Sequence, residues 1–183
     1  MPQSIRRVIT GFDDAGKSVV VDDGLSASTV TIDQIKFART GIWQLDEPPT
    51  DTSAGSEPSG GSIPMTPAAG GMTFMIVELA PDASISRELD MAALGQEMTS
   101  KVPGMMQALD PSKGVGMHKT ETIDFITVVS GEVFLKLDGG EEVHLKAGDL
   151  VVQRGTWHAW RNRSSEPCIL SAVMVSAKGP DSA

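Results

Sequence analysis

The chain has 183 residues, with 24 acidic against 15 basic side chains and a formal net charge of −9. Phosphate-backbone binding and anionic membrane surfaces both require clustered cations, so this charge argues against nucleic acid and membrane as partners. No apolar run is long enough to span a bilayer, and the N-terminal segment lacks the apolar core of a signal peptide, so we expect a cytoplasmic protein. Cys168 is the single cysteine, which excludes an internal disulfide.

The first 71 residues predict strands followed by a long irregular segment. Residues 6–11 and 17–21 are β-branched and flank a turn at 13–16, so they predict a hairpin. Residues 35–45 predict a further strand. The segment 46–71 is dense in Pro, Gly, Ser and Thr and predicts a loop or crossing arm, either a lid over a site or a plain surface loop.

The middle of the chain predicts one strand and one helix. Residues 72–80 read as a strand that ends at Pro81. Beyond it, Asp90 or Ser86 can cap a helix that ends before Pro103. The spacing i, i+3, i+7, i+11 places four apolar residues on one helix face: Met91, Leu94, Met98 and Val102.

From residue 122 onward, short β-branched runs alternate with tight turns. This pattern predicts an all-β sandwich or barrel. The expected strands are 122–129, 132–137, 143–147, 150–153, 156–162 and 168–176.

The histidines are the first candidates for chemistry. Alternate residues of a strand share one face, so His118, Thr120 and Asp124 point the same way, and the apolar neighbours of Asp124 favour the barrel interior. His158 shares its face with Trp160 and Asn162. By contrast, His144 lies between two residues that belong to a buried face, so we expect it on the outer surface.

Two motifs in this region resemble those of the cupin superfamily. In that family the first motif holds a Gly, a His-x-His pair, a Glu and a closing Gly, and the second holds Gly-Asp, a Pro-x-Gly turn, a His and an Asn. The matching positions are Gly116, His118, Thr120, Asp124 and Gly131, then Gly148, Asp149, Gly155, His158 and Asn162. The resemblance covers about residues 110–176 and is to small single-domain cupins.

The resemblance implies a fold and a domain layout. The expected fold is a double-stranded β-helix, also called a jelly-roll barrel, with an N-terminal hairpin or arm and one or two short helices. Residues 1–71 would be strands and a Pro/Gly/Ser-rich loop that pack on the barrel, residues 72–176 the barrel, and residues 177–183 a tail. The resemblance also implies a homodimer.

The resemblance further implies a metal site, and here the chain departs from the family pattern. The four ligand positions fall on His118, Thr120, Asp124 and His158, so a threonine replaces one histidine and the shorter Asp replaces Glu. The remaining set of His118, Asp124 and His158 is a possible facial triad for Fe, or a three-ligand site for Zn, Mn or Ni. A metal-free lumen is equally open, and there Asp124 is expected to hydrogen-bond one of the two histidines.

Two functions follow from this resemblance. The first is a small-molecule enzyme, such as a metal-dependent oxygenase, decarboxylase or isomerase, acting on a small organic acid or phenol in the barrel lumen. The second is a metal-free ligand-binding or sensor cupin without catalysis. The catalytic candidates are His118, Asp124 and His158, and the expected pocket residues are Thr120, Met117, Trp160 and Asn162.

Overall fold

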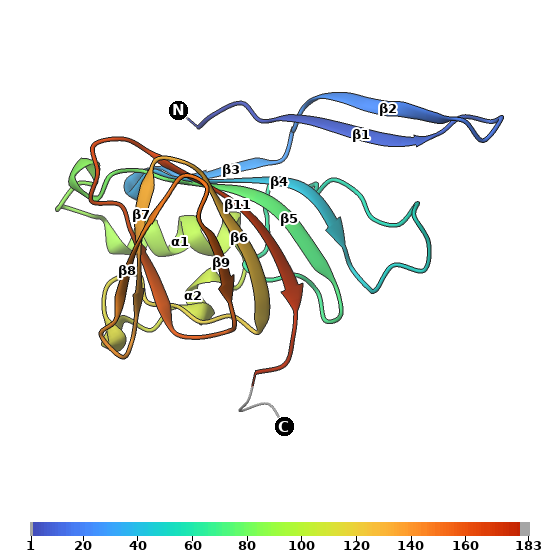
Figure 1. Ribbon diagram of the computed structural model, residues 1–183. Helices are drawn as coiled ribbons and strands as arrows, with labels where there is room; N and C mark the ends of the chain where they lie inside the picture. The colour runs from blue at the N-terminus through green and yellow to red at the C-terminus, as the bar shows by residue number, and fades with distance from the viewer. Residues whose placement is uncertain (1, 180–183) are drawn as a thin grey trace.

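Two antiparallel sheets face each other in the computed structural model, which describes residues 2–179 (Figure 1). The larger sheet has the order β3 (Thr29–Ile32), β4 (Phe37–Leu45), β5 (Met72–Leu79), β11 (Cys168–Ser176), β6 (Thr122–Ser130) and β9 (Leu150–Gln153). The smaller sheet has the order β10 (His158–Arg161), β7 (Glu132–Leu137) and β8 (Glu142–Lys146). This arrangement confirms the expected all-β jelly-roll barrel.

The core between the sheets follows from residue alternation. Along β6 the inward positions Asp124, Ile126 and Val128 are buried, while Ile123 and Phe125 face out. This is the period of two that a half-buried strand requires. The core cluster comprises Met75, Ile126, Val128, Val133, Leu135, Leu145, Cys168, Leu170, Ala172 and Met174. Met75 and Met174 also border the cavity described below, so the core and the site share a wall.

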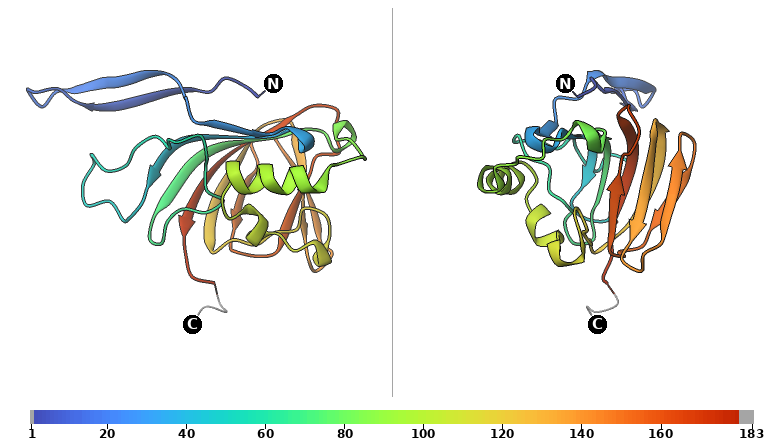
Figure 2. Two further views of the ribbon diagram at one scale, coloured as in Figure 1. Left: turned by 180° about the vertical axis from the view of Figure 1, so that it is seen from behind. Right: turned by 90° about the vertical axis from the view of Figure 1, so that its left-hand side faces the viewer.

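Two helices lie beside the barrel, α1 (Met91–Lys101) and the single turn α2 (Met105–Ala108) (Figure 2). Asp90 caps α1 by accepting hydrogen bonds from the amides of Ala92 and Ala93, as predicted. The apolar stripe packs with Val30, Ile32 and Ile63, except that Met91 is 69% exposed. The prediction for Met91 was wrong because the first helical residue extends past the edge of this cluster. No helix in residues 2–179 has the length and apolar character to cross a membrane.

The predicted N-terminal hairpin is present as β1 (Arg6–Phe12) and β2 (Ser18–Leu25). It forms a separate two-stranded sheet that extends away from the barrel (Figure 1). An ion pair of 2.9 Å between Arg7 and Glu57 connects it to the following loop. Several of its apolar side chains, including Phe12 and Val20, are exposed.

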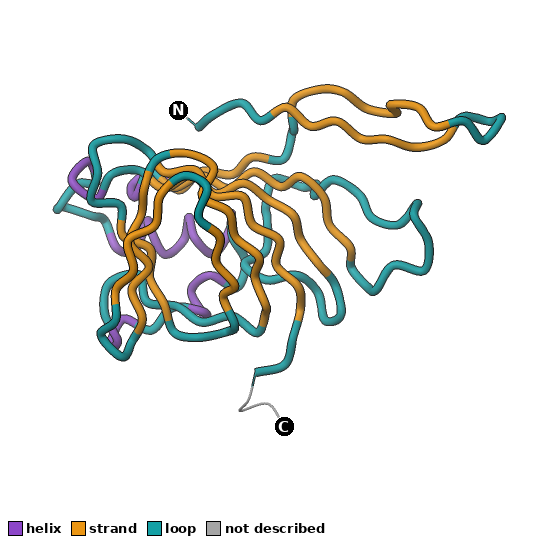
Figure 3. The backbone as a smooth tube through the Cα atoms, in the orientation of Figure 1, coloured by secondary structure: helices purple, strands orange, loops and turns teal. Residues whose placement is uncertain are grey.

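The predicted loop 46–71 has no helix or strand (Figure 3). One isolated bridge joins Ser56 to Gln44, and Ile63 is buried in the cluster beside α1. The loop therefore packs on the molecule although its composition is that of a solvated segment. It also supplies the backbone carbonyls of Pro64 and Met65, which accept hydrogen bonds from Arg39. The short strand β3, which precedes β4, was not predicted.

Candidate functional site

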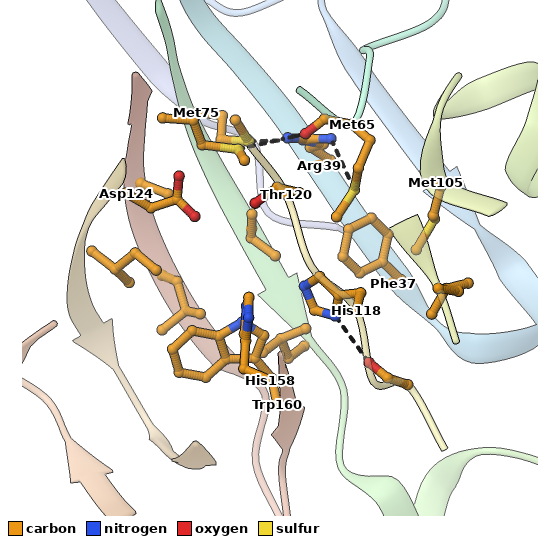
Figure 4. Close-up of a pocket in the computed structure, with 18 of the residues that line it drawn as sticks. Phe37, Arg39, Met65, Met75, Met105, His118, Thr120, Asp124, His158 and Trp160 are labelled. Atoms are coloured by element: carbon orange, nitrogen blue, oxygen red, sulfur yellow. Dashed lines mark hydrogen bonds between the residues drawn. The ribbon is translucent and has the colours of Figure 1, made fainter. Parts of the chain in front are cut away.

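A cavity of about 220 Å³ opens into the barrel next to the helices (Figure 4). Its walls are mostly Met, Leu, Val, Phe and Trp side chains, as in most small-molecule sites. Usual sites for drug-sized ligands have roughly 300–1,000 Å³, so this one suits a smaller molecule. The polar side chains on its walls are Arg39, His118, Thr120, Asp124 and His158.

The backbone brings His118 and His158 together. The amide of His118 donates to the carbonyl of His158 at 2.9 Å, and the amide of His158 donates back at 3.0 Å. Residues that exchange both hydrogen bonds lie directly opposite each other and present their side chains on one face. The two imidazole ring centroids are 4.2 Å apart, and Trp160 lies edge-on to His158 at 5.7 Å.

Both imidazoles are held in the same tautomer. Nδ1 of His118 donates to the carbonyl of Gly116 at 2.9 Å, and Nδ1 of His158 donates to the carbonyl of Thr156 at 2.9 Å. A carbonyl can only accept, so each Nδ1 carries the hydrogen and each Nε2 keeps a lone pair. Burial lowers the pKa of His118, and burial together with His118 lowers the pKa of His158 to about 3. Both rings are therefore neutral at pH 7.

Asp124 is buried on the opposite wall (Figure 4). Its Oδ1 atom has no hydrogen-bond partner among the described residues, and Thr122 interacts with the carboxyl group. Burial raises its pKa to about 6, against the opposing effects of Thr122 and Arg39. Asp124 has no hydrogen bond to either histidine within the described part of the chain. The expected pairing is missing. Backbone carbonyls occupy both Nδ1 atoms, so neither Nδ1–H is available to donate to the carboxylate.

Arg39 on β4 is a site residue that the sequence analysis missed. It is 3% exposed, and its guanidinium lies against Met75 and Met65 (Figure 4). Burial lowers its pKa to about 10, so it remains charged at neutral pH. The sequence did contain a signal for Arg39. This residue follows Phe37 by two residues, so the two side chains share one face of the predicted strand.

The other predicted pocket residues divide into two groups. Thr120 and Trp160 line the cavity, and Thr120 bonds Thr122 at 2.8 Å. Met117 is buried but lies outside the lining, because Gly116 and His118 occupy the face toward the cavity.

Asn162 is also outside the lining, since its amide donates to the carbonyls of Leu79 and Glu166 at the end of β10. His144 is on the outer surface, as expected, where it contacts Glu132 at 3.0 Å.

The predicted metal ligands do not assemble into one set. Within residues 2–179 no three His, Cys, Asp or Glu side chains come close enough together to hold a metal ion. The two imidazoles have the form that a metal requires, with a neutral ring and Nδ1 anchored on a carbonyl. Asp124, however, lies apart from them, and Thr120 is bonded to Thr122. This donor set does not fit a three-ligand centre.

The comparisons with known proteins match the segment that carries the two histidines and Asp124. Residues 105–175 match the family model described as "Cupin domain". A 48-residue segment is 60% identical to "Phomopsin biosynthesis cluster protein C'" of Diaporthe leptostromiformis and makes up 26% of this chain and 25% of that protein. The match thus spans about a quarter of that relative.

A longer match is to "Cupin-domain-containing oxidoreductase fogC" of Aspergillus ruber. It is 26% identical over 156 residues, which cover 85% of this chain and 63% of the relative. Among solved structures, the Cupin_2 domain of an XRE family transcriptional regulator from Enterobacter cloacae is 22% identical, with a TM-score of 0.36, covering 58% of this chain and 83% of that one.

Proposed function

We propose that this chain, whose residues 105–175 match the cupin-domain model, acts on a small organic acid or phenol bound in the barrel lumen, as an enzyme of the oxidoreductase class. The observation that carries the proposal is the cavity itself. It is an apolar chamber of about 220 Å³ in which Arg39, Asp124 and two neutral imidazoles are the main polar groups. The class is taken from the relative that matches most of the chain, which is named an oxidoreductase.

The side chains suggest distinct roles. Each neutral imidazole presents an Nε2 lone pair, which can accept a hydrogen bond from a substrate hydroxyl. A base with a pKa of about 3 removes protons poorly at neutral pH, so His158 orients rather than deprotonates. Asp124, with a pKa of about 6 and an unpartnered oxygen, is the better acceptor for a proton from a substrate O–H group.

The predicted divalent metal, Fe, Zn, Mn or Ni, stays a prediction. We derive no step through it because Asp124 does not join the two histidines as a third ligand. Elemental analysis of the purified protein addresses this point directly. One equivalent of bound divalent metal that is lost in the His118→Asn and His158→Asn variants would show that both histidines are ligands. A third ligand would then have to come from Asp124 or from a bound small molecule.

The experiment for the proposed function compares histidine variants. The wild-type protein is incubated with a panel of small carboxylic acids and phenols, in air and with added electron acceptors, and products are followed by mass spectrometry. We expect His118→Asn and His158→Asn to lower turnover by about 100-fold or more, the usual scale for loss of a positioned polar group in a site. His144→Asn is the matched control, because His144 lies outside the cavity, and it should retain wild-type turnover.

The second candidate is a metal-free ligand-binding or sensor protein. The low pKa of His158 favours it, because that ring accepts hydrogen bonds but transfers protons poorly. Binding without turnover of any bound compound would support this candidate. If no acid or phenol binds, both candidates are wrong.

The proposal also includes a cytoplasmic homodimer. The free, buried thiol of Cys168 is compatible with a reducing compartment. The exposed apolar side chains of the β1–β2 hairpin support the dimer, because an isolated two-stranded hairpin is marginally stable in water.

A further inference from the structure

The hydrogen bonds of Arg39 to the described residues include none to a carboxylate. Its two terminal nitrogens donate to the backbone carbonyls of Pro64 and Met65, at 2.9 and 3.1 Å. No carboxylate forms an ion pair with it among residues 2–179. Asp124 interacts with the guanidinium only by longer-range electrostatic attraction, and the Oδ1 atom of its carboxyl has no hydrogen-bond partner among the described residues. Buried charges in proteins are normally paired, so this guanidinium is an exception that needs an explanation.

The Nε–Nη2 edge of the guanidinium contacts two thioether sulfur atoms, while Nη2 also donates to the carbonyl of Met65. Nε donates to Sδ of Met75 at 2.7 Å, and Nη2 contacts Sδ of Met174 at 3.3 Å. Sulfur is a weak acceptor, and methionine side chains change conformation easily. Nε and the adjacent Nη2 form the pair of parallel donors that a carboxylate accepts in a bidentate contact. Both sulfur atoms belong to residues that line the cavity, so a ligand can reach this edge by displacing them.

We propose that Arg39 binds the carboxylate of the lumen ligand, and that the ligand is a small monocarboxylic acid with an apolar body. This inference rests on the proposed function and narrows its substrate class from acids or phenols to acids. A carboxylate is charged at neutral pH and supplies the two acceptor oxygens that the Nε–Nη2 edge requires. A phenol is neutral at that pH and supplies one oxygen.

The remaining walls define the rest of the ligand. The rest of the lining is mostly apolar and includes Phe37, Val77 and Leu170, and Thr120 lies between Arg39 and His118. Figure 4 places Arg39 with Met75 on one side of the cavity and His158 with Trp160 on another. A ligand anchored on Arg39 therefore extends its apolar body past the methionines toward the Nε2 atoms of His118 and His158. In this orientation the carboxylate is an anchor and the reacting group lies at the other end of the molecule.

The test uses matched probes that differ in charge. The probes are cinnamate with cinnamamide, octanoate with octanamide, and para-propylphenol, and binding to the full chain is measured by titration calorimetry at pH 7.5. We expect at least one acid to bind about 10- to 100-fold more tightly than its amide, the scale of hydrogen bonds to charged groups. The propylphenol should bind no better than the amides.

Substitutions at Arg39 assign the preference to this residue. Arg39→Met replaces the guanidinium with a side chain that suits the methionine-rich wall, and it should bind the acid no better than the amide. Arg39→Lys keeps the charge but loses the bidentate edge, so it should keep part of the preference. Arg163→Met is the matched control, because Arg163 is an exposed arginine outside the cavity, and it should keep the full preference. Thermal unfolding checks that each variant is folded before binding is compared.

The possible outcomes separate the role of Arg39 from the existence of a binding site in the lumen. Equal binding of acid and amide by the wild-type protein, or tighter binding of the phenol, would show that Arg39 does not bind the carboxylate of the ligand. Either result would still agree with a binding site in the lumen. A preference that survives in Arg39→Met would also overturn the role of Arg39, because the carboxylate would then be bound elsewhere. If neither member of either pair binds and the phenol does not bind, both this inference and the lumen site are wrong.

Discussion

Gly131 turns the chain from β6 into β7 with φ of +74°. A Cβ atom at this position would lie 2.5 Å from the carbonyl oxygen of Pro167, which is too close for any real side chain. The closing glycine of the first motif is therefore required by both its backbone conformation and its neighbour.

Replacing Gly131 with alanine should lower the free energy of unfolding by about 3 kcal/mol. The left-handed conformation costs a residue with a Cβ about 1–2 kcal/mol, and displacement of the Pro167 backbone adds to this. Gly140→Ala is the control for conformation alone, because Gly140 has φ of +91° and no atom within 4 Å of the added Cβ. Urea denaturation should show a loss of about 1 kcal/mol for Gly140→Ala. Equal losses at the two positions would contradict the steric argument.

Asp124 makes stability depend on pH in a direction that is unusual for a carboxyl group. Burial raises its pKa from the ordinary 3.8 to about 6. Between these values the unfolded chain has released the proton while the folded chain retains it. The stability contributed by the neutral carboxyl is therefore complete below pH 3.8 and is lost as the pH rises through about 6.

The Asp124→Asn variant, which cannot ionise, should reveal this effect. Relative to wild type, its free energy of unfolding should be higher by about 2 kcal/mol at pH 7.5 than at pH 4, since one pKa unit corresponds to about 1.4 kcal/mol and the unfolded carboxyl is already partly ionised at pH 4. Chemical denaturation of both proteins at the two pH values measures the difference. A difference that does not change with pH would show that Asp124 has an ordinary pKa.

Single residues also show where sequence reasoning stops. His118, Asp124 and His158 could be assigned to the lumen because strand alternation and motif spacing are local properties. Their separation into a histidine pair and an isolated carboxyl could not be predicted, because it depends on the carbonyls of Gly116 and Thr156. The role of Arg39 depends on sulfur atoms and carbonyls from three distant segments.

At the scale of elements, the predictable parts were those with a clear period or a clear turn. The strands from 122 to 176, the hairpin and the cap of α1 by Asp90 were confirmed. The four-residue strand β3 (Thr29–Ile32) is too short to show a period, and it is stabilised by pairing with β4. The position of loop 46–71 could not be predicted from the sequence either, because it depends on the burial of Ile63 and the hydrogen bonds of Arg39.

The β1–β2 hairpin should require a partner in solution. It joins neither barrel sheet, and Phe12 is 65% exposed. Deleting residues 1–25 should convert the proposed dimer into a monomer. The barrel should stay folded, because Ser26 keeps its hydrogen bonds to the carbonyl of Gly41 on β4 and to Glu57. Sedimentation velocity measures the change in mass.

A milder variant tests whether the exposed apolar side chains of the hairpin hold the dimer together, without shortening the chain. Val20→Thr with Val21→Thr retains the strand and its β-propensity but removes exposed apolar surface. It should weaken the dimer, whereas the same exchange at Val152, on the outer face of β9, should not. A full-length chain that sediments as a monomer would refute the proposed dimer.

For the molecule as a whole, Cys168 reports on opening of the barrel. It begins β11, the strand between β5 and β6, and its side chain is buried in the core between the sheets. Burial, with a smaller contribution from Glu132, raises its pKa to about 11, so the reactive thiolate is scarce at pH 8.

A thiol reagent at pH 8 should therefore modify the native protein at the rate of global unfolding. The labelling rate should rise with urea in step with the unfolding transition seen by tryptophan fluorescence. The Gly131→Ala variant, which weakens the β6–β7 turn, should label faster than wild type under native conditions. Fast labelling of the native wild-type protein would show that β11 opens locally.

The two walls of the cavity come from different parts of the chain, and this has a consequence for how such proteins diversify. The segment that matches the family model, residues 105–175, supplies the histidine pair and Asp124. Arg39, with Met65 and Met75, comes from outside that segment. The matched segment therefore carries the wall with the two histidines but not the wall with Arg39. Two descendants of one ancestor can share every motif residue and still select different molecules, through substitutions confined to the first hundred residues.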